Sequence, residues 1–181
     1  MMKRWNSFRC ALLLGASVIA LSACEEPKVD ASVYETVQQC KDDPGVSSQQ
    51  CEQSFKEARS QHAAVAPKYS SEADCQADFG AGKCEKAPYR TSRGGSIFMP
   101  LMMGYMMGSL IGGRRSMMAQ PLYRSAKSPK SFRTADNRNV GSTTGRTRVA
   151  RSATSRPSFK SSTIRRGGFG TSARRYGSAS T

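Results

Sequence analysis

An uncharged stretch over residues 97–113 constrains the fold of this 181-residue chain more than any other feature. Gly104, Gly108 and Gly112 recur in it at every fourth position, which places them on one face of an α-helix. Pro100, which precedes them, suits the first turn of such a helix. The stretch therefore predicts an apolar helix rich in Gly and Met, about 26 Å long against a bilayer core of ~30 Å.

Two interpretations of this segment, which we place at 91–115, remain open. Glycines on one face let another backbone approach closely, as in the small-xxx-small packing of membrane helices. On that basis Gly104, Gly108 and Gly112 are candidate helix-packing residues, for a membrane or for self-association. The alternative is a loop or helix packed on its own domain, because each interior Gly costs a helix about 1 kcal/mol.

The N-terminus carries an export signal in which a positively charged start precedes an apolar run over residues 11–21. The run ends in Leu21-Ser22-Ala23-Cys24, which resembles the bacterial lipobox. The resemblance implies a signal peptide over 1–23, an acylated Cys24 as the first mature residue, and a linker over 24–30. Two or more acyl chains anchor a protein stably. The alternatives are an ordinary cleaved leader and an uncleaved anchor.

The position after Cys24 predicts the destination of the anchored chain. Glu25 stands there in place of the Asp that commonly retains such proteins in the inner membrane. We therefore expect a location in the bacterial cell envelope, facing the periplasm, with the outer membrane favoured over the inner.

Four cysteines remain for the folded part, because Cys10 lies in the signal peptide and Cys24 carries lipid. An even set in an exported chain predicts two disulfides, whose candidates are Cys40, Cys51, Cys75 and Cys84. Three connectivities are open. Local pairing is the simplest, whereas the nested set, Cys40–Cys84 with Cys51–Cys75, would cross-link helices. The intervals do not resemble those of zinc sites, so we predict no metal and no cofactor.

Helical signals surround these cysteines over residues 31–90. A first helix is expected to carry Val33, Val37 and Cys40, and Asp43-Pro44-Gly45 ends it. Ser47 and Gln50 form a capping box that opens a second helix, and Ser71 caps a third. The inward residues of the second and third helices would be Cys51, Phe55, Ala58, His62, Cys75 and Phe79.

This pattern predicts a mostly α fold, in which a small helical domain is stapled by disulfides. The expected core is thin, and domains with such cores usually need covalent staples. It would contain Val33, Val37, Phe55, Ala58, Tyr69 and Phe79. His62 is the only histidine of the chain, and it is expected on a helix face. We therefore predict no catalytic residues and no enzymatic activity.

The basic charge is confined to the C-terminal part. Residues 1–113 hold 12 basic and 12 acidic side chains, whereas 114–181 hold 16 basic ones and Asp136 alone, which accounts for the net charge of +15. A chain rich in Ser, Thr, Arg and Gly buries little apolar surface, so we predict a disordered basic tail over 116–181. The candidates for binding envelope polyanions are Arg114, Arg115, Arg165, Arg166, Arg174 and Arg175.

The tail has two other interpretations. Arg165-Arg166-Gly167-Gly168-Phe169-Gly170 is similar to segments that bind single-stranded nucleic acid. Behind an export signal, however, we do not expect a nucleic-acid partner. The remaining alternative is a solvated tail without a particular partner.

Several short motifs, spread over most of the chain, carry a resemblance to a known family. They are Leu21–Cys24, Cys40 with Cys51, Ala66-Pro67-Lys68-Tyr69, Asp74-Cys75 with Cys84, Phe98-Met99-Pro100-Leu101-Met102, Gly104-Tyr105-Met106-Met107-Gly108, Gln120-Pro121-Leu122 and Arg166-Gly167-Gly168-Phe169-Gly170. Together they resemble the YgiB family of small proteobacterial envelope proteins of uncharacterised function. The resemblance implies neither an activity nor catalytic residues. Members are often encoded beside an ATP-grasp protein similar to glutathionylspermidine synthetase, which implies a functional link to such a protein.

The sequence as a whole favours a non-enzymatic, membrane-anchored structural or interaction protein of the envelope. The alternative function is an accessory subunit that binds an envelope enzyme or an efflux assembly through the glycine face.

Overall fold

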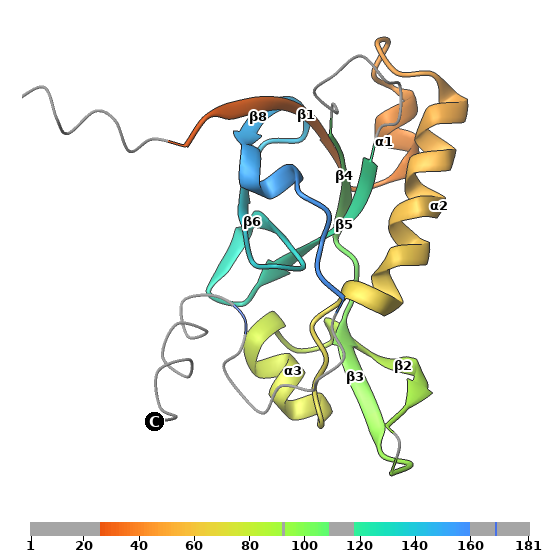
Figure 1. The fold of residues 1–181 in the computed structure, drawn as a ribbon, viewed down its shortest axis with the longest axis vertical. Coiled ribbons are helices and arrows are strands. Elements are labelled where there is room, and N and C mark those ends of the chain that lie inside the picture. The colour runs from red at the N-terminus through yellow and green to blue at the C-terminus, as the bar shows by residue number, and fades with distance from the viewer. Residues whose placement is uncertain (1–25, 92, 109–117, 160–168, 170–181) are drawn as a thin grey trace, which may run out of the picture.

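The computed structural model describes residues 26–91, 93–108, 118–159 and 169. Strands predominate over helices, so the prediction of a mostly α fold is wrong (Figure 1). The elements are, in chain order, β1 (Lys28–Tyr34), α1 (Val37–Lys41), α2 (Ser48–Val65), α3 (Glu72–Phe79), β2 (Cys84–Arg90), β3 (Ser96–Pro100), β4 (Gly104–Gly108), β5 (Met118–Ser125), β6 (Ser128–Thr134), β7 (Asn139–Gly141), β8 (Gly145–Ala150) and the 3₁₀ helix η2 (Arg151–Thr154).

Six strands form one antiparallel sheet in the order β7-β6-β5-β4-β1-β8. In its centre Val33 of β1 lies opposite Met106 of β4, and on the other side of β1 Val29 lies opposite Val149 of β8. The β2–β3 hairpin forms a separate two-stranded sheet. Figure 1 shows a curved main sheet with α2 along one face, while α3 and the hairpin lie together at one end.

The two faces of the main sheet are buried in different ways, because successive side chains of a strand point to opposite faces. One face, here called the inner face, carries a core that η2 covers with Ala153. The other face, the helix-covered face, packs against α1 and α2. The inner core contains Ala31, Val33, Met106, Leu122, Phe132, Val140 and Val149. The helix-covered core contains Tyr34, Cys40, Cys51, Ala58, Tyr105, Met107 and Ala119.

Residues 97–108, the described part of the apolar stretch, form two strands and the link between them, so the predicted helix over 97–113 is wrong. These residues fall in β3, in the link that follows it and in β4, and Pro100 ends β3 instead of opening a helix. All five residues of β4 are buried, since cores cover both faces of this strand, and a strand of that kind is apolar throughout. The four-residue glycine interval does not distinguish the two structures, because four is a multiple of the two-residue period of a strand.

Gly104 and Gly108 therefore lie on the inner face of β4 and not on a helix. A side chain at Gly104 would meet the Tyr34 carbonyl oxygen at 2.7 Å and the Phe132 ring at 3.3 Å. At Gly108 the nearest atom would be Thr154 Cβ at 3.5 Å, which is an ordinary contact. Gly104 thus allows the close approach of β1 and Phe132, whereas Gly108 tolerates a methyl group.

We predict that Gly104→Ala lowers the free energy of unfolding by about 1–3 kcal/mol, the usual cost of overpacking a core. The matched control, Gly108→Ala, should be neutral or slightly stabilising, since alanine loses less conformational entropy than glycine on folding. Urea unfolding of both variants measures the difference. Equal stability of the two variants would contradict this packing of β4.

The described part of the predicted disordered tail is also ordered secondary structure. Residues 118–159 contribute β5, β6, β7, β8 and η2 to the main sheet and its cover. A strand buried on one face needs an apolar residue only at alternate positions. In β8, for example, Val149 is buried while Arg146 and Arg148 are exposed. A segment with few apolar residues can therefore still form a strand of this sheet.

The local helix signals were predicted correctly. Ser47 and Gln50 form the expected capping box at the start of α2, and the Ser71 side chain caps α3. The first helix is the exception. The structure has only the short α1 there, and Val33, which was expected in that helix, lies in β1. Within the described residues, no helix combines the length and the apolarity that crossing a bilayer requires.

Candidate functional site

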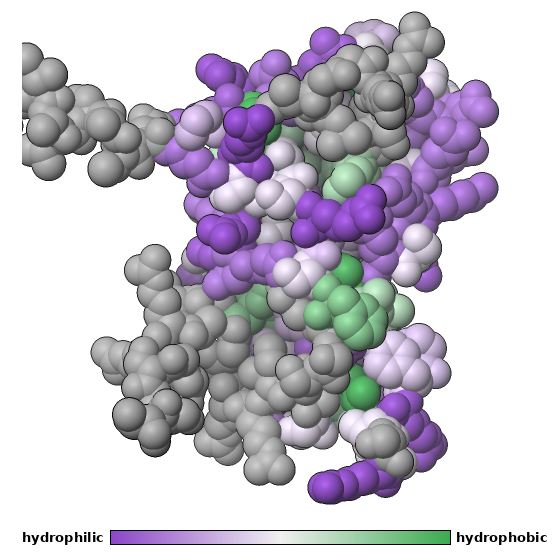
Figure 2. All heavy atoms as spheres, viewed as in Figure 1, coloured by the Kyte–Doolittle hydropathy of each residue, from purple (hydrophilic) through white to green (hydrophobic). Residues whose placement is uncertain are grey.

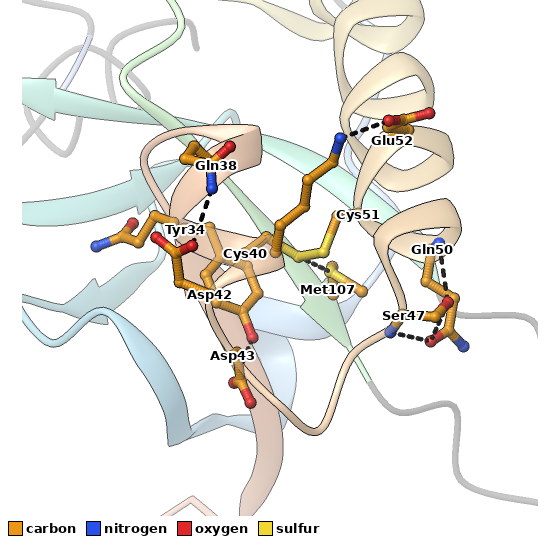
Figure 3. Close-up of a disulfide and its surroundings, with 12 residues drawn as sticks. Tyr34, Gln38, Cys40, Asp42, Asp43, Ser47, Gln50, Cys51, Glu52 and Met107 are labelled. Atoms are coloured by element: carbon orange, nitrogen blue, oxygen red, sulfur yellow. Dashed lines mark hydrogen bonds and ion pairs between the residues drawn. A yellow bond between two sulfur atoms is a disulfide. The ribbon is translucent and has the colours of Figure 1, made fainter.

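The first disulfide, Cys40–Cys51, joins the end of α1 to the first turn of α2, with a Cα–Cα distance of 5.7 Å (Figure 3). Both cysteines are fully buried. The Met107 thioether of β4 lies 4.0 Å from Cys40 Sγ. The disulfide therefore fixes the helix pair on the sheet face beneath it.

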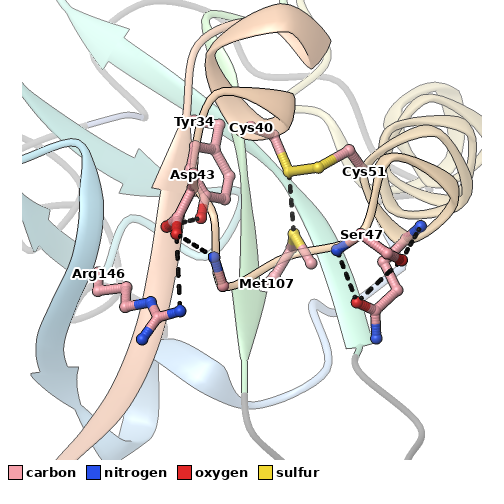
Figure 4. Close-up of polar contacts among 9 residues, drawn as sticks. Tyr34, Cys40, Asp43, Ser47, Cys51, Met107 and Arg146 are labelled. Carbon is pink, nitrogen blue, oxygen red and sulfur yellow. Dashed lines mark hydrogen bonds and ion pairs between the residues drawn. A yellow bond between two sulfur atoms is a disulfide. The ribbon is translucent and has the colours of Figure 1, made fainter.

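Asp43, in the turn after α1, connects this helix pair to the far edge of the sheet (Figure 4). Its carboxylate accepts a 2.8 Å hydrogen bond from the Tyr34 hydroxyl and a 2.9 Å bond from the Gly45 N–H. Arg146 Nη2 of β8 lies 3.6 Å from the same carboxylate. The Gly45 N–H, followed by the Tyr34 hydroxyl, lowers the pKa of Asp43.

Gly45 provides the space for this arrangement. A side-chain carbon at that position would overlap Arg146, whose guanidinium lies across the glycine. The sequence predicts the Asp43-Pro44-Gly45 turn only as the end of a helix. In the structure this turn also contacts Arg146 of β8.

Beside Arg146 an open cleft of about 420 Å³ lies on β1 and β8. Arg146 and Arg148 keep 65% and 68% of their side-chain surface exposed, and Arg148 Nε lies 3.8 Å from Asp30. Guanidinium, hydroxyl and carboxylate groups are suited to binding a polar group, and no thiol or histidine lines the described walls. The lining residues are Asp30, Ala31, Ser32, Met107, Arg146, Thr147 and Arg148.

The start of the described chain is bound to η2 at the end of this same strand pair. The Glu26 carboxylate accepts hydrogen bonds from the Ser152 N–H, at 2.5 Å, and from the Ser152 hydroxyl, at 2.9 Å. The Pro27 carbonyl accepts the Arg151 N–H at 2.9 Å. The Ser152 N–H is the main cause of the lowered pKa of Glu26. The fold is thus fixed two residues after Cys24.

His62 of α2 is buried, and it links the exposed Glu85 to the buried Tyr123. Its Nε2 is 3.1 Å from Glu85 of β2, and its Nδ1 is 3.0 Å from the hydroxyl of Tyr123 in β5. Because a carboxylate only accepts hydrogen bonds, Nε2 carries the proton and Nδ1 accepts the Tyr123 hydroxyl in the neutral ring. The three residues tie α2, the hairpin and the main sheet together.

This arrangement predicts a loss of stability in mild acid. Burial lowers the pKa of His62 from its usual value of 6.5, although Glu85 opposes the shift. The unfolded chain therefore binds more protons than the folded one just below pH 6.5, so the free energy of unfolding declines as the pH falls towards the folded pKa. Urea unfolding at several pH values between about 5 and 8 measures this slope.

The His62→Gln variant serves as the control, since it keeps hydrogen-bonding groups and does not titrate. Its stability should depend less on pH over the same interval. A slope identical to that of the native chain would show that His62 is not the responsible group.

The second disulfide, Cys75–Cys84, joins α3 to β2 with a Cα–Cα distance of 6.2 Å. Nearby, the buried Asp78 carboxylate accepts the Tyr69 hydroxyl at 2.7 Å and the Phe169 N–H at 3.2 Å. Burial, followed by the bond to Asp78, raises the pKa of Tyr69. Phe169, which belongs to the Arg-Gly-Gly motif of the tail, is therefore part of this core.

The structure tests only some of the predicted site residues. The disulfides are confirmed, and of the three open connectivities the chain has the local one. Gly104 and Gly108 lie in β4, so their assignment as helix-packing residues is wrong. Outside the described residues lie Cys24, Gly112, Arg114, Arg115, Arg165, Arg166, Arg174 and Arg175.

Sequence reasoning missed the residues that build the contact between Asp43 and Arg146, the cleft and the chain start. The sequence predicts only a turn at Asp43 and a disordered tail at Arg146. The alternation of Arg146, Thr147, Arg148 and Val149 was the available signal, because it has the two-residue period of a half-buried strand.

These features define a class: a small, two-disulfide protein with an antiparallel sheet. Residues 28–180 match a family model described as "Protein of unknown function (DUF1190)". The chain belongs to this family, whose UPF0441 relatives confirm the resemblance to the YgiB family.

Curated relatives cover most of the chain. It is 41% identical over 173 residues to a UPF0441 protein of Erwinia tasmaniensis, an alignment that covers 87% of this chain and 77% of the relative. For a UPF0441 protein of Yersinia enterocolitica the identity is 36% over 196 residues, with 94% and 84% covered. For one of Sodalis glossinidius it is 38% over 183 residues, with 93% and 84% covered. No solved structure matches the chain.

Proposed function

We propose that this protein is a lipid-anchored, non-enzymatic interaction protein of the bacterial cell envelope, exposed to the periplasm. The observation that carries the proposal is the pair of disulfides. It agrees with the export signal that we predict from the N-terminal residues. Disulfides of this kind form and persist in oxidising compartments, which include the periplasm. The lipobox at Leu21–Cys24 then supplies the anchor.

The placement of the polar groups supports a non-enzymatic role. Catalysis by a nucleophile and a base requires both groups to converge on an accessible pocket. His62 has both ring nitrogens engaged, by Glu85 and by Tyr123. The Tyr123 hydroxyl belongs to a fully buried side chain. The open cleft instead presents Arg146 and Arg148, which are binding groups.

The proposal is tested by labelling cells with a palmitate analogue and separating their membranes. The native chain should be labelled, found in the membrane fraction and enriched in the outer membrane, as Glu25 favours. Cys24→Ala should lose the label and keep its leader. Cys10→Ala is the matched control, because that cysteine lies within the signal peptide, and it should label normally. A native chain without label, recovered with free thiols, would contradict the proposal.

A further inference from the structure

Because the start of the described chain is bonded to the fold, a lipid anchor at Cys24 determines which side of the protein faces the membrane. This inference rests on the proposed lipid anchor at Cys24. Glu26 is bonded to Ser152 and Pro27 to Arg151, both in η2. Two residues span at most about 7 Å from Cys24 to Glu26. An acyl group on Cys24 would therefore hold this end of the domain against the lipid headgroups, with no spacer between them.

Basic side chains surround the point at which the chain enters the fold. Lys28 begins β1 and is paired with Ala150 of β8, while Arg148 is paired with Asp30. Arg151 follows directly, and its N–H is the donor to Pro27. Lys28, Arg148 and Arg151 are all exposed, and we call these three residues the chain-start surface. Figure 2 shows mostly hydrophilic residues around this point.

The carboxylates nearby leave this surface with an excess of positive charge. Glu26 is engaged by Ser152, and Asp30, with 87% of its side chain exposed, lies 3.8 Å from Arg148. Glu25 precedes Glu26 in the sequence, and Arg138 also acts on the Glu26 carboxylate. Four basic groups thus accompany three carboxylates, one of which is bonded to η2. The pKa of Glu26 is lowered, so this carboxylate keeps its charge and its hold on η2 in mild acid.

We propose that the chain-start surface rests on the bilayer and that Lys28, Arg148 and Arg151 contact the phosphates of anionic phospholipid headgroups. The β2–β3 hairpin and α2 then face away from the anchored end (Figure 1). Each basic residue near an anionic membrane contributes roughly 1 kcal/mol, which suits a contact that orients a protein already held by its lipid. The position of this surface beside the anchor favours a lipid headgroup over a free phosphate, because a soluble ligand does not need to bind next to the anchor.

The first experiment maps which end of the full, acylated chain touches lipid in living cells. A photo-crosslinking amino acid replaces Arg151 in one strain and Arg90, an exposed residue at the end of β2, in another. Irradiation should give phospholipid adducts at position 151 and none at position 90. Equal adducts at both positions, or adducts at 90 alone, would overturn the orientation.

The second experiment tests the charges on purified, acylated protein in vesicles with or without phosphatidylglycerol. The crosslinker now stands at Lys28, in the native background and in the Arg148→Gln/Arg151→Gln background. Losing two basic groups should reduce the docked population up to about thirtyfold in anionic vesicles, and Arg148→Lys/Arg151→Lys should restore it. The matched control is Arg59→Gln/Arg90→Gln, whose residues are exposed elsewhere.

Each outcome separates the inference from the function on which it rests. The headgroup contact would be overturned if the adduct yield were the same in the native and the Arg148→Gln/Arg151→Gln backgrounds. It would also be overturned if the yield were as high without phosphatidylglycerol as with it. Inorganic phosphate that abolishes the adducts at millimolar concentration would assign the surface to a soluble ligand instead. A Cys24 without acyl groups would overturn the anchor itself, and the mass of the crosslinked protein reports this independently.

Discussion

Replacing Phe169 with alanine is expected to lower the free energy of unfolding by about 3–5 kcal/mol, the usual cost of removing a buried phenyl ring. Phe169 is 4% exposed. Its ring centroid lies 4.8 Å from that of Phe79 and 6.3 Å from that of Tyr123, and its N–H is bonded to Asp78. One residue of the Arg-Gly-Gly motif therefore stabilises the core between α3 and β5.

Phe159→Ala is the control, since it removes the same ring from the same tail. Phe159 is 71% exposed, and its ring centroid is 4.9 Å from Lys68 Nζ. Its removal should cost no more than about 1 kcal/mol. Urea unfolding followed by circular dichroism measures both variants. Similar stabilities would show that Phe169 does not belong to the core.

Replacing both Cys40 and Cys51 with alanine is expected to cost about 2–4 kcal/mol, because the disulfide restricts the unfolded chain. Both sulfur atoms are also buried against Met107, so the substitution removes packing as well as a cross-link. The variant should unfold at a lower urea concentration than the oxidised native chain.

The corresponding change of Cys75 and Cys84 provides the comparison. The two disulfides close loops of similar length, with sequence separations of 11 and 9 residues. Cys84 is only partly buried, so less packing is lost and the cost should be smaller. A Cys40/Cys51 variant as stable as the native chain would contradict the role assigned to this disulfide.

Local signals predicted the helices well, and long-range pairing explains what they missed. The Ser47–Gln50 capping box and the Ser71 cap act within four residues, so the sequence displays them directly. The glycines of β4, by contrast, fit a helix face and a strand face equally well. Only the pairing of β4 with β1 and β5 decides between them.

The same limit applies to the candidate site. The four cysteines identified both disulfides but left their pairing open. Arg146 reaches Asp43, and Arg151 reaches Pro27, across most of the chain. Such contacts follow from the pairing of β8 with β1, and no local sequence pattern predicts that pairing. The family is described as one of unknown function, so membership in it does not point to these residues.

The measurement that tests the proposed function most directly is the intact mass and peptide map of the protein, purified from membranes without reduction. We expect a chain that begins at acylated Cys24 and contains the disulfides Cys40–Cys51 and Cys75–Cys84. An unprocessed N-terminus, with Cys40, Cys51, Cys75 and Cys84 as free thiols, would contradict both the anchor and the oxidising compartment. The basic residues of the chain would then require a partner other than the envelope membrane.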